Sequence, residues 1–180
     1  MEIRTARLIL REFVADDWQA VLAYQSDPRY LQFYEWTQRT EADARAFVQR
    51  FIGWQNETPR AKFQLALELN GCLIGNCGVR LTNAPTREAE LGYELDPNFW
   101  RNGYATKAAR AMLDFGFREL RLHRVTASCI AENIASARVL EKLGFQREGC
   151  LREREWFKAR WWDTLIFGLL DREWQIGDRI

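Results

Sequence analysis

Two periods of hydrophobic residues occur along this chain, and they predict where its strands and helices lie. Alternation of apolar and polar residues favours a half-buried strand, whereas an apolar residue at every third or fourth position favours a helix. The first pattern predicts strands at residues 8–13, 62–68, 72–81, 88–95, 124–130, 146–158 and 161–171. The second predicts helices at residues 16–26, 40–55, 104–119 and 133–143.

The order of these elements predicts one domain of mixed α/β class. Asn70-Gly71 is a strong hairpin turn, so the first half of the sheet should be antiparallel. The helix at 104–119 links the strands at 88–95 and 124–130, which we expect to be parallel and joined by a right-handed crossover. We therefore expect a mixed, largely antiparallel sheet of six to seven strands, flanked by about four helices. Its ligand should lie at the carboxyl ends of the parallel strands.

The loop before the predicted helix at 104–119 has the features of an anion site. The first N–H groups of a helix lack partners within the helix, and the helix dipole attracts negative charge there. Arg101 and Asn102 supply side-chain donors, and Gly103 lets a ligand approach the backbone. We hypothesise that the segment from Arg101 to Thr106 binds phosphate or pyrophosphate. The simpler alternative is a strand–helix turn that needs a glycine, since neither GxGxxG nor GxxxxGK[ST] occurs.

A second polar pair stands at the start of the predicted helix at 133–143. Asn133 and Ser136 are three residues apart and therefore share one face of that helix. By themselves they are typical of a helix N-cap and first turn. Only in combination with the glycine loop do they indicate a ligand site.

Length, charge and apolar runs restrict the partners of this protein. Its 180 residues suffice for one domain with a sizeable core, and a formal net charge of +1 gives no global field to attract nucleic acid or a membrane. The apolar run Leu165–Leu170 is far too short to span a bilayer, and the charged N-terminal segment is unlike a secretory signal. We therefore expect a cytoplasmic protein.

The cysteines and the single histidine argue against a metal site. Cys72, Cys77, Cys129 and Cys150 show no CxxC spacing, and His123 is the only histidine. A histidine-based metal centre or a Cys–His nucleophile pair is therefore not expected. We expect reduced, part-buried cysteines and no metal cofactor.

Two segments, GYELDPNFWRNGYATKAARAMLDFGF and AENIASARVLEKLGFQREG, together resemble the GNAT superfamily of acyl-CoA-dependent N-acetyltransferases. Within it they are most similar to the ribosomal-protein N-terminal acetyltransferases of the RimJ/RimL type, which modify a terminal serine or alanine. The opening TARLILREF and the segment from Arg152 to Asp163 also fit that group. The resemblance covers residues 7–172 and implies one GNAT domain there.

The resemblance implies that acetyl-CoA is the cosubstrate and indicates where it binds. The pyrophosphate loop of the superfamily, Q/R-x-x-G-x-G/A, falls on residues 100–105, with Trp100 in the place of glutamine or arginine. The preceding strand is implied to pair its backbone with the pantetheine arm, and Asn133 to hydrogen-bond that arm. The implied binding residues are Tyr93, Leu95, Arg101, Asn102, Gly103, Tyr104, Ala105, Thr106, Asn133 and Ser136.

The resemblance also implies catalytic residues. Many superfamily members place an acidic tyrosine seven residues after the asparagine, and here that position is Leu140. The RimJ/RimL type instead has a serine near the thiol sulfur and a glutamate on the next strand as base, which match Ser136 and Glu155. Glu90 and Glu94 are alternative bases, and Glu155 is equally typical of a solvated residue paired with arginines. A base is needed because an α-amine, with a pKa near roughly 8, is largely protonated at neutral pH.

The function we expect is direct transfer of acetyl to a primary amine in a ternary complex, with a protein or peptide N-terminal α-amine as acceptor. The alternatives are a small amine (aminoglycoside, polyamine or amino acid) and a CoA-binding protein without activity. The acceptor side should be built from the aromatic loop 30–36, the helix at 40–55 and the turn at 156–162. Exposed aromatic residues and related proteins suggest a homodimer.

Overall fold

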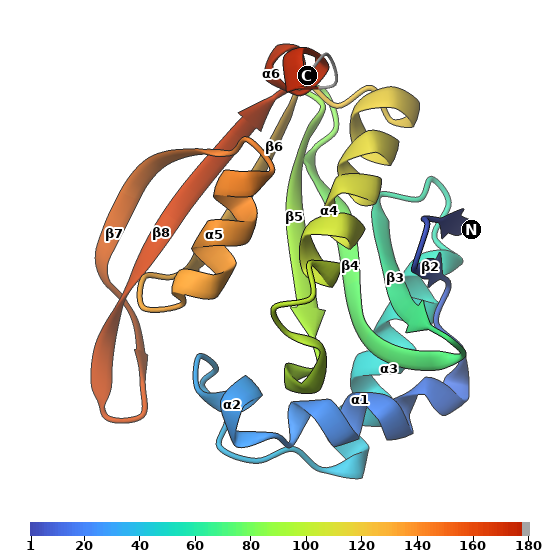
Figure 1. Cartoon of the computed structure of the whole chain (residues 1–180), viewed down its shortest axis with the longest axis vertical. Coiled ribbons are helices and arrows are strands. Elements are labelled where there is room, and N and C mark those ends of the chain that lie inside the picture. Colours follow the sequence, from blue (N-terminus) through green and yellow to red (C-terminus); the bar gives the residue numbers. More distant parts are fainter. Residues whose placement is uncertain (178–180) are drawn as a thin grey trace.

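An eight-stranded sheet runs through the protein, whose computed structural model describes residues 1–177 (Figure 1). The strand order is β1-β2-β3-β4-β5-β6-β8-β7, and every neighbouring pair is antiparallel except β5–β6. The α/β class and the mixed, largely antiparallel sheet are thus confirmed, with eight strands in the described part instead of six to seven. The strands are β1 (Glu2–Arg4), β2 (Ile9–Arg11), β3 (Lys62–Leu69), β4 (Cys72–Asn83), β5 (Glu88–Leu95), β6 (Arg124–Ile130), β7 (Gln146–Phe157) and β8 (Arg160–Leu170).

Six α-helices are described, two more than the sequence pattern predicts. They are α1 (Trp18–Gln25), α2 (Pro28–Leu31), α3 (Glu41–Gln55), α4 (Tyr104–Asp114), α5 (Ile134–Lys142) and α6 (Asp171–Gly177). The additional ones, α2 and α6, are short, so an apolar stripe cannot reveal them. None of the helices within residues 1–177 is long and apolar enough to cross a bilayer.

The segment expected to be one helix from 104 to 119 changes its winding at Asp114. Beyond α4 the chain forms a π-helical turn, Phe115–Glu119, in which Leu120 N donates to Phe115 O at 3.2 Å. Gly116 lies in this turn, and a Cβ there would be 2.9 Å from Leu122 Cδ1. The glycine therefore allows this turn to pack closely against Leu122 before β6 begins.

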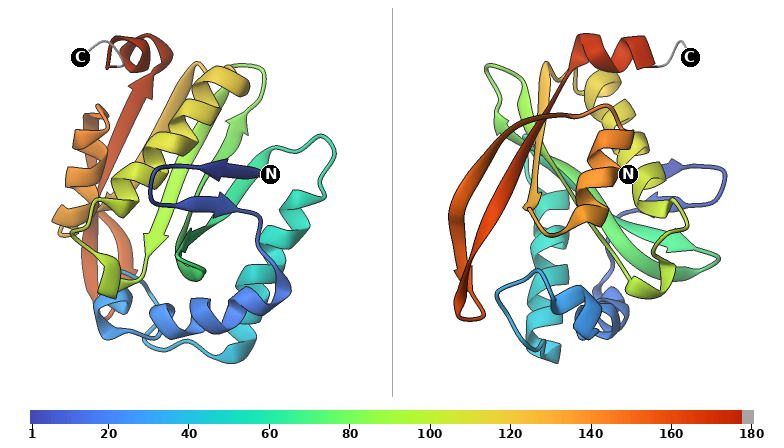
Figure 2. Two further views of the ribbon diagram at one scale, coloured as in Figure 1. Left: turned by 45° about the vertical axis from the view of Figure 1, so that its right-hand side comes forward. Right: turned by 60° about the vertical axis from the view of Figure 1, so that its left-hand side comes forward.

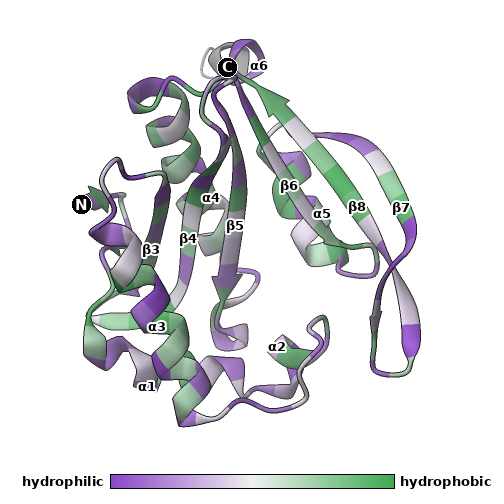
Figure 3. Ribbon diagram, turned by 180° about the vertical axis from the view of Figure 1, so that it is seen from behind, coloured by the Kyte–Doolittle hydropathy of each residue, from purple (hydrophilic) through white to green (hydrophobic). Residues whose placement is uncertain are grey.

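Strands β5 and β6 are parallel, as predicted, but they pair over a short length. Their register joins Glu88–Glu90 to Arg124–Thr126, and beyond these residues the two strands diverge (Figure 3). The second half of β5 therefore has a backbone edge that faces away from β4 and is not covered by β6.

Two hydrophobic clusters cover the two faces of the sheet. The larger one joins the sheet to α4 and α5, and includes Met112, Leu140 and Phe167. The smaller one joins α1, α2 and α3 to the sheet through Ala66 and Leu73. Figure 2 shows α4 and α5 together on one side and α1 and α3 displaced to the other. The carboxyl end of β5 lies between these two groups of helices.

Candidate active site

The loop between β5 and α4 exposes backbone amides, as an anion site requires. Arg101 and Gly103 both have positive φ, 64° and 77°, and residues 101–103 are exposed. The first hydrogen bond of α4 is donated by Lys107 N to Gly103 O at 3.0 Å. The N–H groups of residues 104–106 precede that bond and have no acceptor within the helix. The residues fit a phosphate group at the N-terminus of α4.

Trp100 stands at the first position of this loop, where the superfamily pattern has glutamine or arginine. Its indole Nε1 donates to Leu95 O at 2.8 Å, which fixes the start of the loop to the end of β5. The carbonyl of Leu95, expected to pair with a pantetheine arm, therefore has one of its two lone pairs already engaged.

Arg7, which the sequence pattern does not single out, supports the same loop. Its guanidinium donates to Asn102 O at 2.9 Å and lies 4.7 Å from the centroid of the Tyr104 ring. The Asn102 amide donates to Phe99 O and Trp100 O, at 3.2 and 2.9 Å, so this side chain shapes the loop. Arg7 also places a positive charge beside the exposed amides. The sequence contains no signal for a contact between residues 95 positions apart.

Tyr93 of β5 and Ser136 of α5 meet where β5 and β6 diverge. The two hydroxyl oxygens are 2.9 Å apart, and the Tyr93 hydroxyl lies 3.1 Å from Ser136 O. Burial raises the pKa of Tyr93, which keeps its hydroxyl neutral. Asn133 is the N-cap of α5, with Oδ1 accepting from Ser136 N at 3.1 Å. Among the described residues its Nδ2 makes no hydrogen bond, so this donor remains for a ligand. Leu140, where other members have a tyrosine, is buried in the core.

The glutamates of β5 lie on the opposite face from Tyr93, because side chains alternate along a strand. Glu90 is paired with Arg80 at 3.3 Å, and Arg80 also donates to Gln64 Oε1 at 3.1 Å. A Cβ at Gly92 would lie 2.5 Å from the Arg80 guanidinium, so Gly92 provides the space in which Arg80 lies. Glu90 is therefore paired with a cation on this face.

Glu94 differs from the other candidate bases in that it has no cation. Its Oε2 accepts from the Tyr24 hydroxyl at 3.2 Å and from the amides of Gln25 and Asn76, both at 3.1 Å. Burial raises the pKa of Glu94, and these hydrogen bonds offset part of that effect. No arginine or lysine of the described chain lies within ion-pair distance of it. The sequence indicates Glu94 as a candidate base but does not predict these hydrogen-bond partners.

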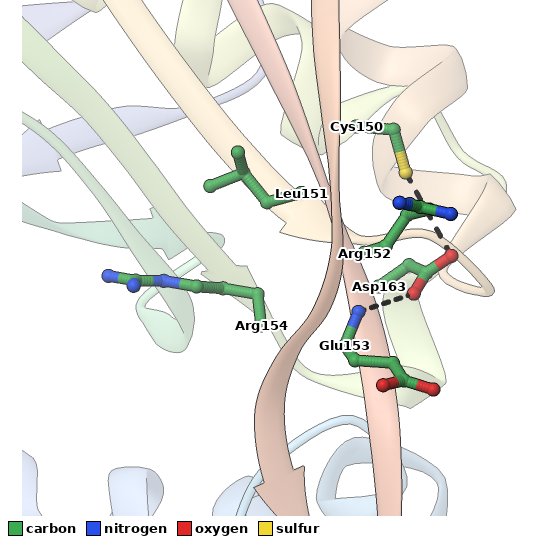
Figure 4. Close-up of a pocket in the computed structure, with 6 residues that line it drawn as sticks. All are labelled: Cys150, Leu151, Arg152, Glu153, Arg154 and Asp163. Atoms are coloured by element: carbon green, nitrogen blue, oxygen red, sulfur yellow. Dashed lines mark hydrogen bonds between the residues drawn. The ribbon is translucent and has the colours of Figure 1, made fainter.

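Glu155 lies on the outer hairpin of β7 and β8, just beyond a bulge. At the bulge the three residues 152–154 oppose Asp163 alone, and Asp163 Oδ1 accepts from Glu153 N at 2.8 Å (Figure 4). The Glu155 side chain is 51% exposed and 4.0 Å from Arg154. Among the described residues, the hydrogen bonds of Ser136 are to Tyr93 and Asn133 and not to Glu155.

An open pocket lies at this bulge. Figure 4 shows Leu151 and Arg154 on one side of the hairpin, and Cys150, Arg152 and Asp163 on the other. The lining residues are Cys150, Leu151, Arg152, Glu153, Arg154 and Asp163.

The two predicted acceptor segments, 30–36 and 156–162, lie against each other. Lys158 Nζ donates to Leu31 O at 2.5 Å, and the rings of Phe33 and Trp162 meet edge to face at 6.3 Å. At the tip of the hairpin, Trp156 and Trp161 pack together and remain 58% and 52% exposed. Within the described residues, no group of three or more His, Cys, Asp or Glu side chains is arranged to bind a metal.

Comparison with known proteins shows the family to which the chain belongs. The acetyltransferase (GNAT) domain family matches residues 7–146. The uncharacterised N-acetyltransferase YnaD of Bacillus subtilis is 40% identical over 174 residues, which are 97% of this chain and 99% of that protein. A GNAT-family acetyltransferase from Bacillus anthracis has a TM-score of 0.83 and 32% identity, covering 96% of this chain and 100% of that one.

The fold is also that of a ribosomal-protein acetyltransferase. RimL in complex with coenzyme A has a TM-score of 0.84 at 19% identity, covering 94% of this chain and 98% of that one. The resemblance of the two sequence segments to the GNAT superfamily is confirmed by the family match. On the family match over residues 7–146 and the relatives at 32% and 40% identity, the chain belongs to the GNAT family and is an N-acetyltransferase.

Proposed function

We propose that this enzyme transfers acetyl from acetyl-CoA directly to the α-amine of a protein or peptide N-terminus, in a ternary complex. One observation carries the proposal. The amides of residues 104–106, which have no acceptor within α4, and the Tyr93–Ser136 pair lie on the α4–α5 face, whereas Glu90 and Glu94 lie on the other face of the same strand. The thioester would sit at the divergence of β5 and β6, with the cosubstrate on one side and the amine on the other.

Each part of the cosubstrate has a group to hold it. The amides of Arg101–Thr106 would bind the pyrophosphate, with the charge of Arg7 beside them. The uncovered edge of β5 around Tyr93 and Leu95 would pair with the strand-like pantetheine arm. The free Nδ2 of Asn133 would donate to the same arm.

The chemistry requires a base for the amine and stabilisation of the leaving thiolate. We assign the base to Glu155 on the resemblance, with Glu90 as the alternative. Once the amine has lost a proton to the base, its nitrogen attacks the thioester carbon, the C–N bond forms and the C–S bond breaks. The nitrogen then gives up a second proton, which balances the charge of the released thiolate. The Ser136 hydroxyl would donate a hydrogen bond to the departing thiolate, and the neutral Tyr93 hydroxyl, 2.9 Å away, would hold it in place.

A protein N-terminus is the acceptor we favour because of the surface beyond the glutamates. The hairpin tip with exposed Trp156 and Trp161 joins the segment 30–36 and offers more apolar surface than a small amine needs. The RimJ/RimL resemblance supports the same acceptor, and with it a cytoplasmic, homodimeric enzyme.

A polyamine is the second candidate acceptor. A spermidine N-acetyltransferase from Vibrio cholerae, in complex with CoA and spermine, has a TM-score of 0.80 at 21% identity. A carboxylate without a cation, such as Glu94, would suit a polyamine as well as an α-amine.

The test is a comparison of kcat/KM for Ser- and Ala-initiated peptides, spermidine, an aminoglycoside and amino acids. The proposal expects the highest value with a peptide, and a clear preference for spermidine would replace it by the second candidate. Glu155→Gln should lower kcat and change its acid limb while leaving acetyl-CoA binding nearly intact. A wild-type pH–rate profile in that variant would reject Glu155 as the base.

A further inference from the structure

Glu94 and Tyr30 form a polar site whose hydrogen-bonding capacity is not filled. The three hydrogen bonds to the Glu94 carboxylate all go to Oε2, and within the described residues Oε1 accepts none. The Tyr30 hydroxyl is buried, in a residue that is 4% exposed, and has no partner in the described chain. The Tyr30 hydroxyl lies near the Glu94 carboxylate and favours its ionised form, but the two groups do not meet the distance and angle of a hydrogen bond. A buried hydroxyl without a partner costs stability, so its presence needs an explanation.

The charge of Glu94 is equally uncompensated. The surrounding arginines contact amides instead: Arg39 donates to Gln25 Oε1 at 2.9 Å, and Arg80 donates to Gln64 Oε1. These amides, with Asn76, stand between the arginines and the carboxylate. A carboxylate that is largely removed from water and lacks a cation is unfavourable in the free protein. A ligand cation would remove that cost.

Glu94 lies on the face of β5 where we expect the acceptor to bind. It follows Tyr93, whose hydroxyl meets Ser136 on the acetyl-CoA face, and it projects to the opposite face of the same strand. The residue as a whole is half-buried. The aromatic rings of Tyr24, Tyr30 and Tyr34 surround it, in contact with one another at 4.5 to 5.5 Å between centroids.

We propose that the Glu94 carboxylate and the Tyr30 hydroxyl bind the protonated primary amine of the acceptor and set the preference for cationic acceptors. One ammonium N–H would donate to Glu94 Oε1. Another would donate to the Tyr30 oxygen, which the ligand reaches by displacing the side chains that cover it in the free protein. The role is recognition, separate from proton removal by Glu155, and it rests on the proposed transfer to an amine. Both acceptor candidates, an N-terminal α-amine and a polyamine, carry such a group.

Substitutions on one strand test this assignment. Glu94→Gln keeps the shape and removes the charge, and should raise the KM for the amine about tenfold or more. The KM for acetyl-CoA and kcat at saturating amine should change little, unlike in the Glu155→Gln variant. Glu88→Gln is the matched control on the same face of β5, roughly 20 Å away at ~3.3 Å per residue. An unchanged amine KM in Glu94→Gln would overturn the proposal.

Tyr30→Phe removes only the oxygen that lacks a partner. If this hydroxyl is merely structural, its loss should leave the amine KM unchanged and not lower the melting temperature, because no hydrogen bond is broken. The proposal instead expects a several-fold higher amine KM in a variant that remains fully folded. Equal KM values in Tyr30→Phe and wild type would remove Tyr30 from the site.

Direct binding separates this inference from the proposed function. Spermidine and a Ser-initiated peptide would be titrated calorimetrically into the wild type and Glu94→Gln, each saturated with CoA. Weaker binding to the variant supports the inference even if no acetyl transfer is detected, in which case the proposed function alone fails. Equal binding, or no binding of either amine to the wild type, refutes the inference.

The pH dependence adds a third readout. The titratable groups that face Glu94 are Tyr24 from α1, Tyr30 from α2 and Tyr34 from the loop that follows, and burial raises the pKa of each, so all remain neutral. The amine KM of the wild type should therefore rise as the pH falls and Glu94 takes up a proton. The same titration in Glu94→Gln should be flat, and a parallel rise would assign the effect to another group.

Discussion

Replacing Gly103 by valine should weaken acetyl-CoA binding far more than it weakens the fold. Gly103 has φ +77°, and the nearest atom to a Cβ there is the end of the Arg7 side chain at 3.9 Å. The folding penalty is therefore the left-handed backbone of an L-residue, roughly 1–2 kcal/mol, and not a clash within the protein. At roughly 2–4 °C for each kcal/mol in a chain of this size, the melting temperature should fall by only a few degrees.

The binding penalty is larger because the backbone conformation of residue 103 orients the amides that follow it. A hydrogen bond to a charged group contributes about 1.5–3 kcal/mol, so misplacing two amides of residues 103–106 costs about 3 kcal/mol or more. That corresponds to a loss of affinity of about 100-fold or more. Isothermal titration of acetyl-CoA into both proteins measures it directly.

Gly71 supplies the matched control. It lies in the turn between β3 and β4 with φ +81° and open space around its Cβ. Gly71→Val should therefore carry the same strain and a similar loss of melting temperature, but bind acetyl-CoA as the wild type does. Equal affinities of the Gly103→Val and wild-type proteins, or equal losses in the two variants, would refute the reasoning.

Three further changes have defined outcomes. Arg7→Gln should raise the KM for acetyl-CoA several-fold, since it removes the hydrogen bond to Asn102 O and a charge beside the loop; Arg4→Gln, an exposed residue paired with Glu2, should not. Tyr93→Phe should lower kcat and reduce stability by about 1 kcal/mol, read as a change in urea midpoint, because the hydroxyl contact with Ser136 is lost. The pKa of Glu94 is raised in the folded protein, so protonated Glu94 favours the folded state. This stabilisation should be complete below the ordinary glutamate pKa of roughly 4.3 and should be lost as the pH rises through the pKa of the folded state. The melting temperature of Glu94→Gln relative to that of the wild type should therefore increase from acid to neutral pH. A difference that does not change with pH would contradict this.

The parts of the fold that follow local rules could be predicted from the sequence. The helix expected at 40–55 begins with a local signal, the capping box of Thr40 and Asp43, and Asn70-Gly71 turns the expected hairpin with positive φ at both residues. The loop ending at Gly103 could be recognised as well, since a glycine between a strand and a helix is a local requirement.

Features built from distant residues could not be predicted. The one-turn helix α2 escaped because four residues carry no periodic pattern, although Asp27 and Pro28 are good starting residues for it. The contact from Arg7 to Asn102 O depends on the turn between β1 and β2 lying beside the loop before α4. The surroundings of Glu94 come from α1, α2 and β4, so its lack of a cation has no counterpart in the sequence near it.

The central claim is that acetyl-CoA lies between α4 and α5, with its pyrophosphate on the N-terminus of α4. A crystal structure of the complex with CoA tests this most directly. It should show pyrophosphate oxygens within hydrogen-bond distance of backbone nitrogens of residues 101–106, and the thiol at the Tyr93–Ser136 pair. A pyrophosphate bound elsewhere, for example at the bulge lined by Arg152 and Arg154, would contradict the account.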